Sequence, residues 1–271
     1  MHDILFRIPL PGGKELPIHS YGVMAMVGFL AAILVARWRA RRAGVSVDTA
    51  TDVALWALFA GIIGSRVAYV LLYPQDIKTF ADVFKIWEGG LVFYGGFIAA
   101  TIVVLILLRI RNERILAMLD VLAPSLALGQ AFGRIGCFLR GCCYGAPVRP
   151  GAWYGIVFPP DSVPYCGLSP SEMPVRPALF PTQILSALDL FVIFLILSLF
   201  FKRRRAEGQV VALCFMLVSV ERFIMEFYRG DTHAPGHLSN AQWISIVAFF
   251  AGLGLMVYAG GRARQEGLQK A

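Results

Sequence analysis

Several arginines of this chain lie in or beside apolar segments, where a charged side chain is energetically costly. Arg66, Arg134 and Arg222 lie inside long apolar stretches, and Arg229 follows shortly after the last of them. An arginine at the centre of a bilayer costs about 2.5–3.5 kcal/mol on insertion scales, so such residues need a counter-charge or an anionic ligand. Glu226 can neutralise only one of the two arginines near it. The excess positive charge favours a pocket for a phosphate group, because guanidinium groups bind phosphate oxygens in pairs.

The spacing of these residues predicts that they share helical faces. Arg222, Glu226 and Arg229 are spaced i, i+4, i+7, which places them on one stripe of a helix. Arg66 shares a stripe with Tyr69 in the same way. A competing interpretation treats each arginine as one partner of an interhelical salt bridge, or as a side chain that snorkels to the membrane surface. A phospholipid headgroup is the anion expected at this depth.

Two segments of the chain are rich in glycine, one around Arg134 and one at the start of the third apolar stretch. Gly129 and Gly133 are one turn apart and predict a close approach between helices, and further glycines up to Gly145 predict that the backbone leaves the helix and lines a cavity. The segment 88–96 contains four glycines and would place backbone N–H groups at the start of a helix, which attracts anions.

Three of the five cysteines are close in sequence, at Cys137, Cys142 and Cys143. They could form a redox pair or a metal site. The adjacent pair is poorly spaced for an ordinary zinc knuckle, however, and a Cys-x-x-Cys motif is absent. We therefore expect structural thiols, no bound metal and no cofactor.

The composition shows what kind of protein must position these side chains. The 271 residues are 58% hydrophobic and only 15% charged, with a mean hydropathy of +0.67. A soluble domain typically has about 25% charged residues, so this chain is expected to be a single membrane domain over residues 1–271. The net charge of +8 falls in short clusters between apolar runs rather than in one stripe, so nucleic acid is not an expected partner.

Seven apolar segments are each long enough to cross about 30 Å of hydrocarbon as a helix. The sequence thus predicts an all-α polytopic membrane protein with seven transmembrane helices and a small irregular periplasmic cap at 137–180, between the fourth and fifth helices. The cap segment is rich in glycine, proline and aromatic residues. The predicted spans are 20–36, 50–73, 91–108, 116–136, 181–201, 209–228 and 239–259.

Basic clusters follow the first, third, fifth and seventh segments. With seven spans they all lie on one side, which the positive-inside rule assigns to the cytoplasm. The N-terminus is then periplasmic and the C-terminus cytoplasmic. The first residues include Pro9 and Pro11 and lack a basic region followed by a cleavage site, so a removed signal peptide is not expected.

The pattern from Asp120 to Gly145, which includes Gly133-Arg134-Ile135-Gly136-Cys137, resembles the signature of bacterial prolipoprotein diacylglyceryl transferases. Further pieces of the chain are similar to motifs of that family, in the same order and over roughly residues 20 to 231. They are Ser20-Tyr21-Gly22, Gly64-Ser65-Arg66, Trp87-x-Gly-Gly-Leu-Val-Phe-Tyr94, Pro181-Thr182-Gln183 and Arg222-x3-Glu226-Phe-Tyr-Arg229.

This resemblance implies a seven-span enzyme of the bacterial inner membrane. It would move the diacylglyceryl group of phosphatidylglycerol onto the lipobox cysteine thiol of a preprolipoprotein signal peptide, forming a thioether and releasing glycerol phosphate. Its essential arginines correspond to Arg134 and Arg222, with Arg66, Glu226 and Arg229 in support. The lipid bilayer would be both solvent and source of substrate.

The chain departs from the motifs of this family at several positions. A histidine found in some members is Tyr94 here, an asparagine is Cys137, a later asparagine is Arg140, and an acidic residue is Cys142. These changes leave the identity of the general base open. The predicted catalytic residues are Arg134, Arg222 and Tyr94, without a metal. The predicted substrate-binding residues are Tyr21, Arg66, Gly136, Cys137, Gly145, Gln183, Glu226 and Arg229.

Two alternative functions would use the same residues. The arginines could serve a transporter of anionic solutes, although the chain has no clear internal repeat of the kind that many transporters show. Cys137, Cys142 and Cys143 could instead form the centre of a membrane thiol oxidoreductase.

Overall fold

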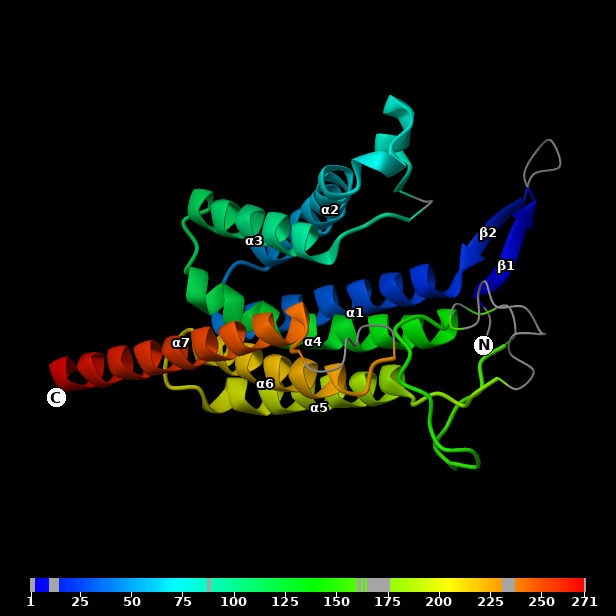
Figure 1. Ribbon diagram of the computed structural model, residues 1–271. Helices are drawn as coiled ribbons and strands as arrows, with labels where there is room; N and C mark the ends of the chain where they lie inside the picture. The colour runs from blue at the N-terminus through cyan, green and yellow to red at the C-terminus, as the bar shows by residue number, and fades with distance from the viewer. Residues whose placement is uncertain are drawn as a thin grey trace. The chain divides into compact units, whose positions relative to one another are not determined.

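The computed structural model describes residues 3–9, 15–86, 89–159, 162, 164, 176–230 and 237–270. In this part of the chain every predicted apolar segment forms an α-helix, and the helix bounds lie within a few residues of those predicted, apart from longer ends on the first and last helices (Figure 1). The helices are α1 Ser20–Ala43, α2 Val47–Leu72, α3 Phe93–Ile110, α4 Ile115–Arg140, α5 Thr182–Arg203, α6 Gln209–Glu226 and α7 Asn240–Lys270.

Six of these helices, all except α6, are long and apolar enough to cross a membrane. The chain is therefore a polytopic helical membrane protein. The 18 residues of α6 include Glu221, Arg222 and Glu226, so composition alone does not identify this helix as a span. A span by α6, and with it the count of seven, stays a prediction.

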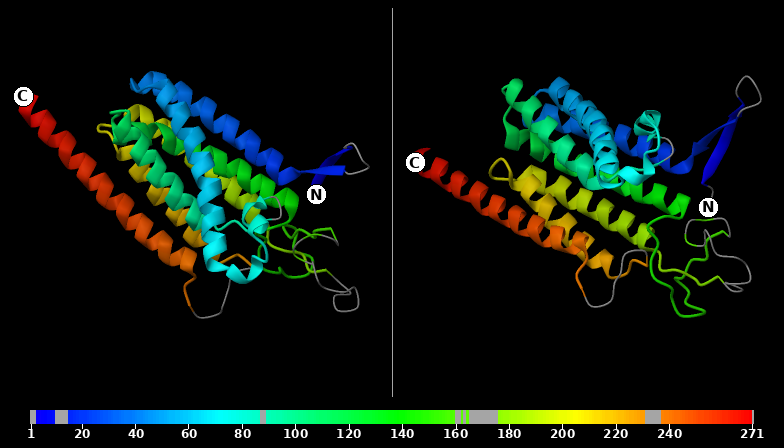
Figure 2. Two further views of the ribbon diagram at one scale, coloured as in Figure 1. Left: turned by 90° about the horizontal axis from the view of Figure 1, so that it is seen from above. Right: turned by 45° about the horizontal axis from the view of Figure 1, so that its top comes forward.

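The chain divides into two compact units. The first comprises Met1–Ala32 and Leu122–Ala271, and the second comprises Ile33–Val121. In the first unit α5 packs on α6 and α6 packs on α7, as the views in Figures 1 and 2 show. The N-terminal half of α1 packs on α4 at Gly28, where a Cβ atom would lie 2.7 Å from the Cβ of Phe132 and 3.0 Å from the carbonyl oxygen of Gly129. The predicted close approach at Gly129 is thus confirmed.

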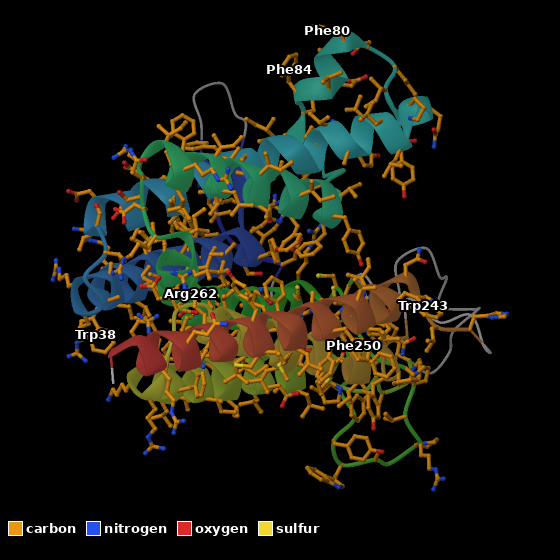
Figure 3. The ribbon with its side chains drawn as sticks, turned by 90° about the vertical axis from the view of Figure 1, so that its left-hand side faces the viewer. Trp38, Phe80, Phe84, Trp243, Phe250 and Arg262 are labelled. Atoms are coloured by element: carbon orange, nitrogen blue, oxygen red, sulfur yellow. The ribbon has the colours of Figure 1, made fainter. Side chains whose placement is uncertain are left out.

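The second unit contains α2 and α3, which pack closely through small residues. A Cβ atom on Gly64 would lie 2.7 Å from the carbonyl oxygen of Gly95, and one on Gly96 would overlap Ser65 of α2. The short helices η1 (Pro74–Asp76) and η2 (Phe80–Phe84) connect α2 to α3. Figure 3 shows Phe80 and Phe84 on η2, where their exposed rings lie 5.5 Å apart.

Two features differ from the sequence-based expectation. The α4 helix continues to Arg140, so the irregular segment begins at Gly141 and not at residue 137. Gly141 has a φ of +81°, a conformation that glycine adopts at low cost, and this explains the exit point. An antiparallel hairpin of β1 (Ile4–Pro9) and β2 (Glu15–His19) precedes α1 and was not predicted. The predicted cap spans 137–180, and its residues 160, 161, 163 and 165–175 lie outside the described residues.

Candidate functional site

Three arginines of the first unit form one electrostatic cluster. Arg134 lies on α4, Arg222 lies on α6, and Arg229 follows α6; the charge of Arg222 interacts with both of the others. Glu226 is almost fully buried, and its Oε2 lies 2.8 Å from Nη2 of Arg222 and 4.0 Å from Nε of Arg229. Within the described residues, Arg134 makes no hydrogen bond or ion pair with protein. Its donors are therefore available to an anionic ligand.

A second buried acid, Glu221, belongs to this cluster and was missed by the sequence analysis. It is 8% exposed, lies within electrostatic reach of Arg134 and Arg222, and hydrogen-bonds to Ser186 of α5. In the described part of the chain its Oε1 has no hydrogen-bond partner. Glu221 precedes Arg222 and falls outside the i, i+4, i+7 pattern, so spacing gave no reason to select it. Three arginines against two glutamates still leave a surplus of positive charge.

The helical position predicted for Arg229 is wrong. The α6 helix ends at Glu226, and Arg229 instead pairs with Gly145 in an isolated antiparallel bridge. Gly145 also donates its N–H to the carbonyl oxygen of Phe180, 3.2 Å away, and Ala146 donates to Tyr228 at 2.9 Å. Three separate segments of the chain therefore meet at Gly145 and fix the backbone that carries Arg229.

These three segments can come together because Gly145 has no side chain. A Cβ atom there would lie 2.7 Å from the Cβ of Phe180 and 2.9 Å from the carbonyl oxygen of Tyr228, and would overlap the carbonyl oxygen of Phe180. Gly230 approaches the same place, because its Cβ would lie 2.7 Å from the carbonyl oxygen of Gly145. Gly145 is thus needed for backbone approach, and its predicted part in substrate binding stays a prediction.

The first turn of α5 anchors the chain after α4. Gln183 is 1% exposed and donates from Nε2 to the carbonyl oxygen of Cys142 at 2.9 Å, while Thr182 donates from Oγ1 to that of Cys143 at 2.8 Å. Cys143 has a φ of +58°, which is uncommon for a residue other than glycine. These bonds hold the turn in a fixed conformation, so Gln183 contributes by positioning the backbone.

This turn brings the sulfur atoms of Cys137, Cys142 and Cys143 within 4.8 Å of one another. All three thiols are free and partly buried. Hydrogen bonds from the Cys137 and Cys142 thiols, with smaller contributions from the charges of Arg229 and Arg134, lower the pKa of the Cys143 thiol. The thiol cluster therefore lies beside the arginine cluster.

Tyr21, in the first turn of α1, completes the first unit's site. The α1 helix can approach α4 closely because Gly136 has no side chain. A Cβ atom on Gly136 would lie 3.1 Å from Cδ2 of Tyr21 and 3.2 Å from the Cβ of Met24. The Tyr21 hydroxyl lies within electrostatic reach of Arg134 and of the three thiols. Tyr21 is 40% exposed.

Arg66 of the second unit binds protein carbonyl groups. Its Nε donates to Val83 at 3.0 Å, and its Nη1 donates to Gly89 at 2.8 Å and to Gly90 at 3.0 Å. Its Nη2 donates to the carbonyl oxygen of Asp82. This buried guanidinium thus fastens the segment between α2 and α3 onto α2.

The glycines of segment 88–96 make this arrangement possible. Gly89 and Gly90 have φ values of +95° and +69°, and a Cβ atom on Gly90 would lie 2.6 Å from Nη1 of Arg66. Both glycines turn their carbonyl oxygens toward Arg66. The predicted anion site made of backbone N–H groups begins at residue 88, which lies outside the described residues. At Gly89 and Gly90 the groups that face Arg66 are carbonyl acceptors.

A pocket of about 290 Å³ adjoins Arg66, and its wall includes Tyr69, Asp76, Lys78 and Asp82. The Tyr69 hydroxyl donates to Asp76 at 2.6 Å. The ammonium group of Lys85, 2.7 Å from the carboxylate, and hydrogen bonds from the backbone N–H and the side chain of Thr79 hold the pKa of Asp82 well below its usual range.

Most predicted site residues fall in the first unit, whereas Arg66 and Tyr94 fall in the second. Tyr94 lies in the first turn of α3, is 39% exposed and makes an edge-to-face contact with Phe93 at 5.6 Å between ring centroids. The residues brought together around Arg134, directly or through the backbone, are Tyr21, Gly136, Cys137, Gly145, Gln183, Arg222, Glu226 and Arg229.

Known proteins are similar to this chain over nearly its whole length. Residues 8–258 match the family model described as prolipoprotein diacylglyceryl transferase. A phosphatidylglycerol–prolipoprotein diacylglyceryl transferase of Clostridium tetani is 33% identical, with 93% of this chain and 96% of that protein covered. One from Clostridium perfringens is 32% identical (91% and 93% covered), and one from Burkholderia lata is 33% identical (90% and 91% covered).

Proposed function

The chain belongs to the prolipoprotein diacylglyceryl transferase family, and from that premise we propose its reaction and the residues that perform it. It is a transferase that moves the diacylglyceryl group of phosphatidylglycerol to a prolipoprotein. The acceptor is the thiol of the lipobox cysteine in the signal peptide. The products are a thioether-linked diacylglyceryl peptide and glycerol phosphate.

The proposed reaction is a nucleophilic displacement at a carbon atom of the glyceryl group. The thiolate sulfur attacks the glyceryl carbon that carries the phosphate, a carbon–sulfur bond forms, and the carbon–oxygen bond to the phosphate breaks with its electron pair remaining on oxygen. Negative charge therefore grows on the departing phosphomonoester. Fixed cations around that oxygen stabilise the transition state more than the substrate, which is what accelerates a reaction.

One observation carries the assignment of the phosphate site: the cationic cluster around Arg134. Arg222 and Arg229 share Glu226, whereas Arg134 makes no hydrogen bond or ion pair within the described residues. We assign Arg134 to hydrogen bonding with the phosphate oxygens and Arg222 to stabilising the negative charge of the phosphate. Arg229 and Glu226 set the electrostatic potential around this group. Tyr21 is positioned to donate a hydrogen bond to the phosphate or the thiol.

Arg66 has another role than the one predicted, and the role of Tyr94 stays a prediction. Because Arg66 donates to four carbonyl groups, we assign it to holding residues 82–83 and 89–90 in place rather than to binding the lipid phosphate directly. Participation of Tyr94 as a proton acceptor remains a prediction. A neutral tyrosine hydroxyl is a weak base.

The membrane arrangement is also part of the proposal. We propose that α6 spans the bilayer with its ionisable residues facing protein, which gives seven spans in the bacterial inner membrane. The N-terminus and the irregular segment after α4 are then periplasmic, and the basic clusters and the C-terminus are cytoplasmic.

The test is release of glycerol phosphate by the purified full-length protein. Vesicles containing phosphatidylglycerol are mixed with a lipobox peptide, or with the same peptide carrying serine in place of cysteine. We expect release only with the cysteine peptide. Release without any peptide would identify a phospholipase, and no release under either condition would refute the transferase.

A further inference from the structure

The thiol cluster formed by Cys137, Cys142 and Cys143 has the composition and geometry of a metal site. Its three sulfur atoms lie within 4.8 Å of one another. Sulfur atoms bound to one Zn²⁺ at about 2.3 Å are separated by about 3.8–4.0 Å, so the three need to move by less than about 1 Å to share an ion. Such a set of thiols, without histidine or carboxylate, suits a thiophilic d¹⁰ cation.

The surroundings support a charged centre. Zn²⁺ with three thiolates carries a net charge of −1, and Arg134 and Arg229 lie within electrostatic reach of Cys143. Two of the three thiols are placed by backbone anchors that lie far away in sequence, since Gln183 and Thr182 hold the carbonyl groups of Cys142 and Cys143. The protein therefore maintains an uncommon backbone conformation, with a positive φ at Cys143, at the point where the thiols converge.

We propose that Cys137, Cys142 and Cys143 bind one Zn²⁺ ion as thiolates and that the fourth tetrahedral position takes the thiol of the acceptor peptide. The second half of this proposal rests on the proposed transferase function. Zinc sites with three protein ligands characteristically leave the fourth position for water or substrate. A thiol bound to zinc loses its proton, here to solvent, and arrives as the thiolate that the displacement needs.

The proximity of the two clusters makes the proposal chemically coherent. The zinc-bound thiolate would attack the glyceryl carbon while Arg134 stabilises the phosphate that leaves. The thioether formed is neutral and a weaker ligand than a thiolate, so the product can dissociate and return the ion to its three-thiolate state. No oxidant or reductant is needed at any step.

Cobalt binding tests the site directly. Full-length protein is purified in detergent under reducing conditions, freed of metal and titrated with Co²⁺, which reports thiolate ligands through charge-transfer absorption. We expect one ion per chain, displaced by Zn²⁺, with binding at least about 100-fold weaker in each of Cys137→Ser, Cys142→Ser and Cys143→Ser. Cys214→Ser is the matched control, because that thiol lies on α6 against Ala123 and outside the cluster. Absence of the charge-transfer band, or its survival in the triple variant, would overturn the site.

The fourth ligand is tested on the same samples. Adding the lipobox cysteine peptide is expected to change the ligand-field spectrum of bound cobalt, and the serine peptide is not. An unchanged spectrum with the cysteine peptide would refute coordination of the acceptor thiol. These readouts do not depend on turnover. A spectrum that responds to peptide in a protein that releases no glycerol phosphate would contradict the transferase function alone, whereas release by a protein without the cobalt band would contradict the metal site alone.

Discussion

At the scale of single residues, Arg134 differs from the other arginines of the site. It makes no hydrogen bond or ion pair within the described chain, whereas Arg222 pairs with Glu226 and Arg66 binds four carbonyl groups. An unpaired guanidinium in a largely apolar protein is costly, and it is retained where an anion will bind. Catalysis should therefore depend most strongly on this side chain.

We expect Arg134→Ala to lower kcat about 10²–10³-fold, the size of loss seen when one donor to a developing anion is removed. Arg134→Lys should retain part of the activity, because an ammonium group supplies charge without the paired donors. Glycerol phosphate release measures both. Arg205→Ala, at an exposed position between α5 and α6, is the control and should keep full activity. Full activity in Arg134→Ala would remove Arg134 from the mechanism.

Glu226 is predicted to matter for stability. Glu226→Gln keeps the side-chain shape but leaves Arg222 and Arg229 without their shared counter-charge, and we expect a loss of roughly 1–3 kcal/mol, since Arg222 is partly solvated. Glu15→Gln is the matched comparison, because it breaks an exposed ion pair with Arg7 of 3.0 Å and should change stability by less than about 1 kcal/mol. Thermal denaturation in detergent compares them. Equal effects in the two variants would contradict the buried network.

Residue types and helical spacing were enough to select Arg134, Arg222 and Glu226, because ionisable residues are conspicuous in apolar segments. They were not enough for Glu221, or for the partners of Arg66. Those partners are carbonyl groups, which every residue has, and only the path of the chain decides which of them a guanidinium meets. The convergence of three thiols likewise depends on Thr182 and Gln183, about 40 residues further along the chain.

At the scale of elements, the site depends on backbone approach after α4. The segments at Gly145, Phe180 and Tyr228 bond to one another through N–H and carbonyl groups, and this places Arg229 near Glu226. Short polar segments of this kind leave little hydrophobic pattern, so their pairing could not be predicted. The helices could, because seven apolar runs of suitable length have few alternatives to a helix in lipid.

We expect Gly145→Ala to be destabilising by about 1–3 kcal/mol, because the added methyl group would overlap the Phe180 backbone. Transferase activity should fall as well, since Arg229 would shift with its bridge. Gly254→Ala in α7 is the control, because its added methyl group would have no neighbouring atom within 4 Å and alanine favours a helix. Thermal denaturation and glycerol phosphate release report the two effects. Equal stability of the two variants would show that the close approach at Gly145 is not required.

At the scale of the whole molecule, the distribution of charge predicts how the chain lies in the membrane. Reporter proteins fused after residues 112 and 205 and at the C-terminus should be cytoplasmic, while reporters after residues 76 and 155 should be periplasmic. Green fluorescent protein and alkaline phosphatase distinguish the two sides. A periplasmic C-terminus would show that α6 does not cross, and would refute the seven-span arrangement.

A helical membrane protein with a cationic site can take its lipid substrate from the bilayer that also solvates it. The central claim is that the diacylglyceryl group moves and the phosphate leaves. The mass of the lipobox peptide after reaction with phosphatidylglycerol of defined acyl chains tests this most directly. We predict a gain equal to one diacylglyceryl group on the cysteine, without phosphorus. A peptide that retains phosphate, or that gains only an acyl chain, would contradict the proposed bond cleavage.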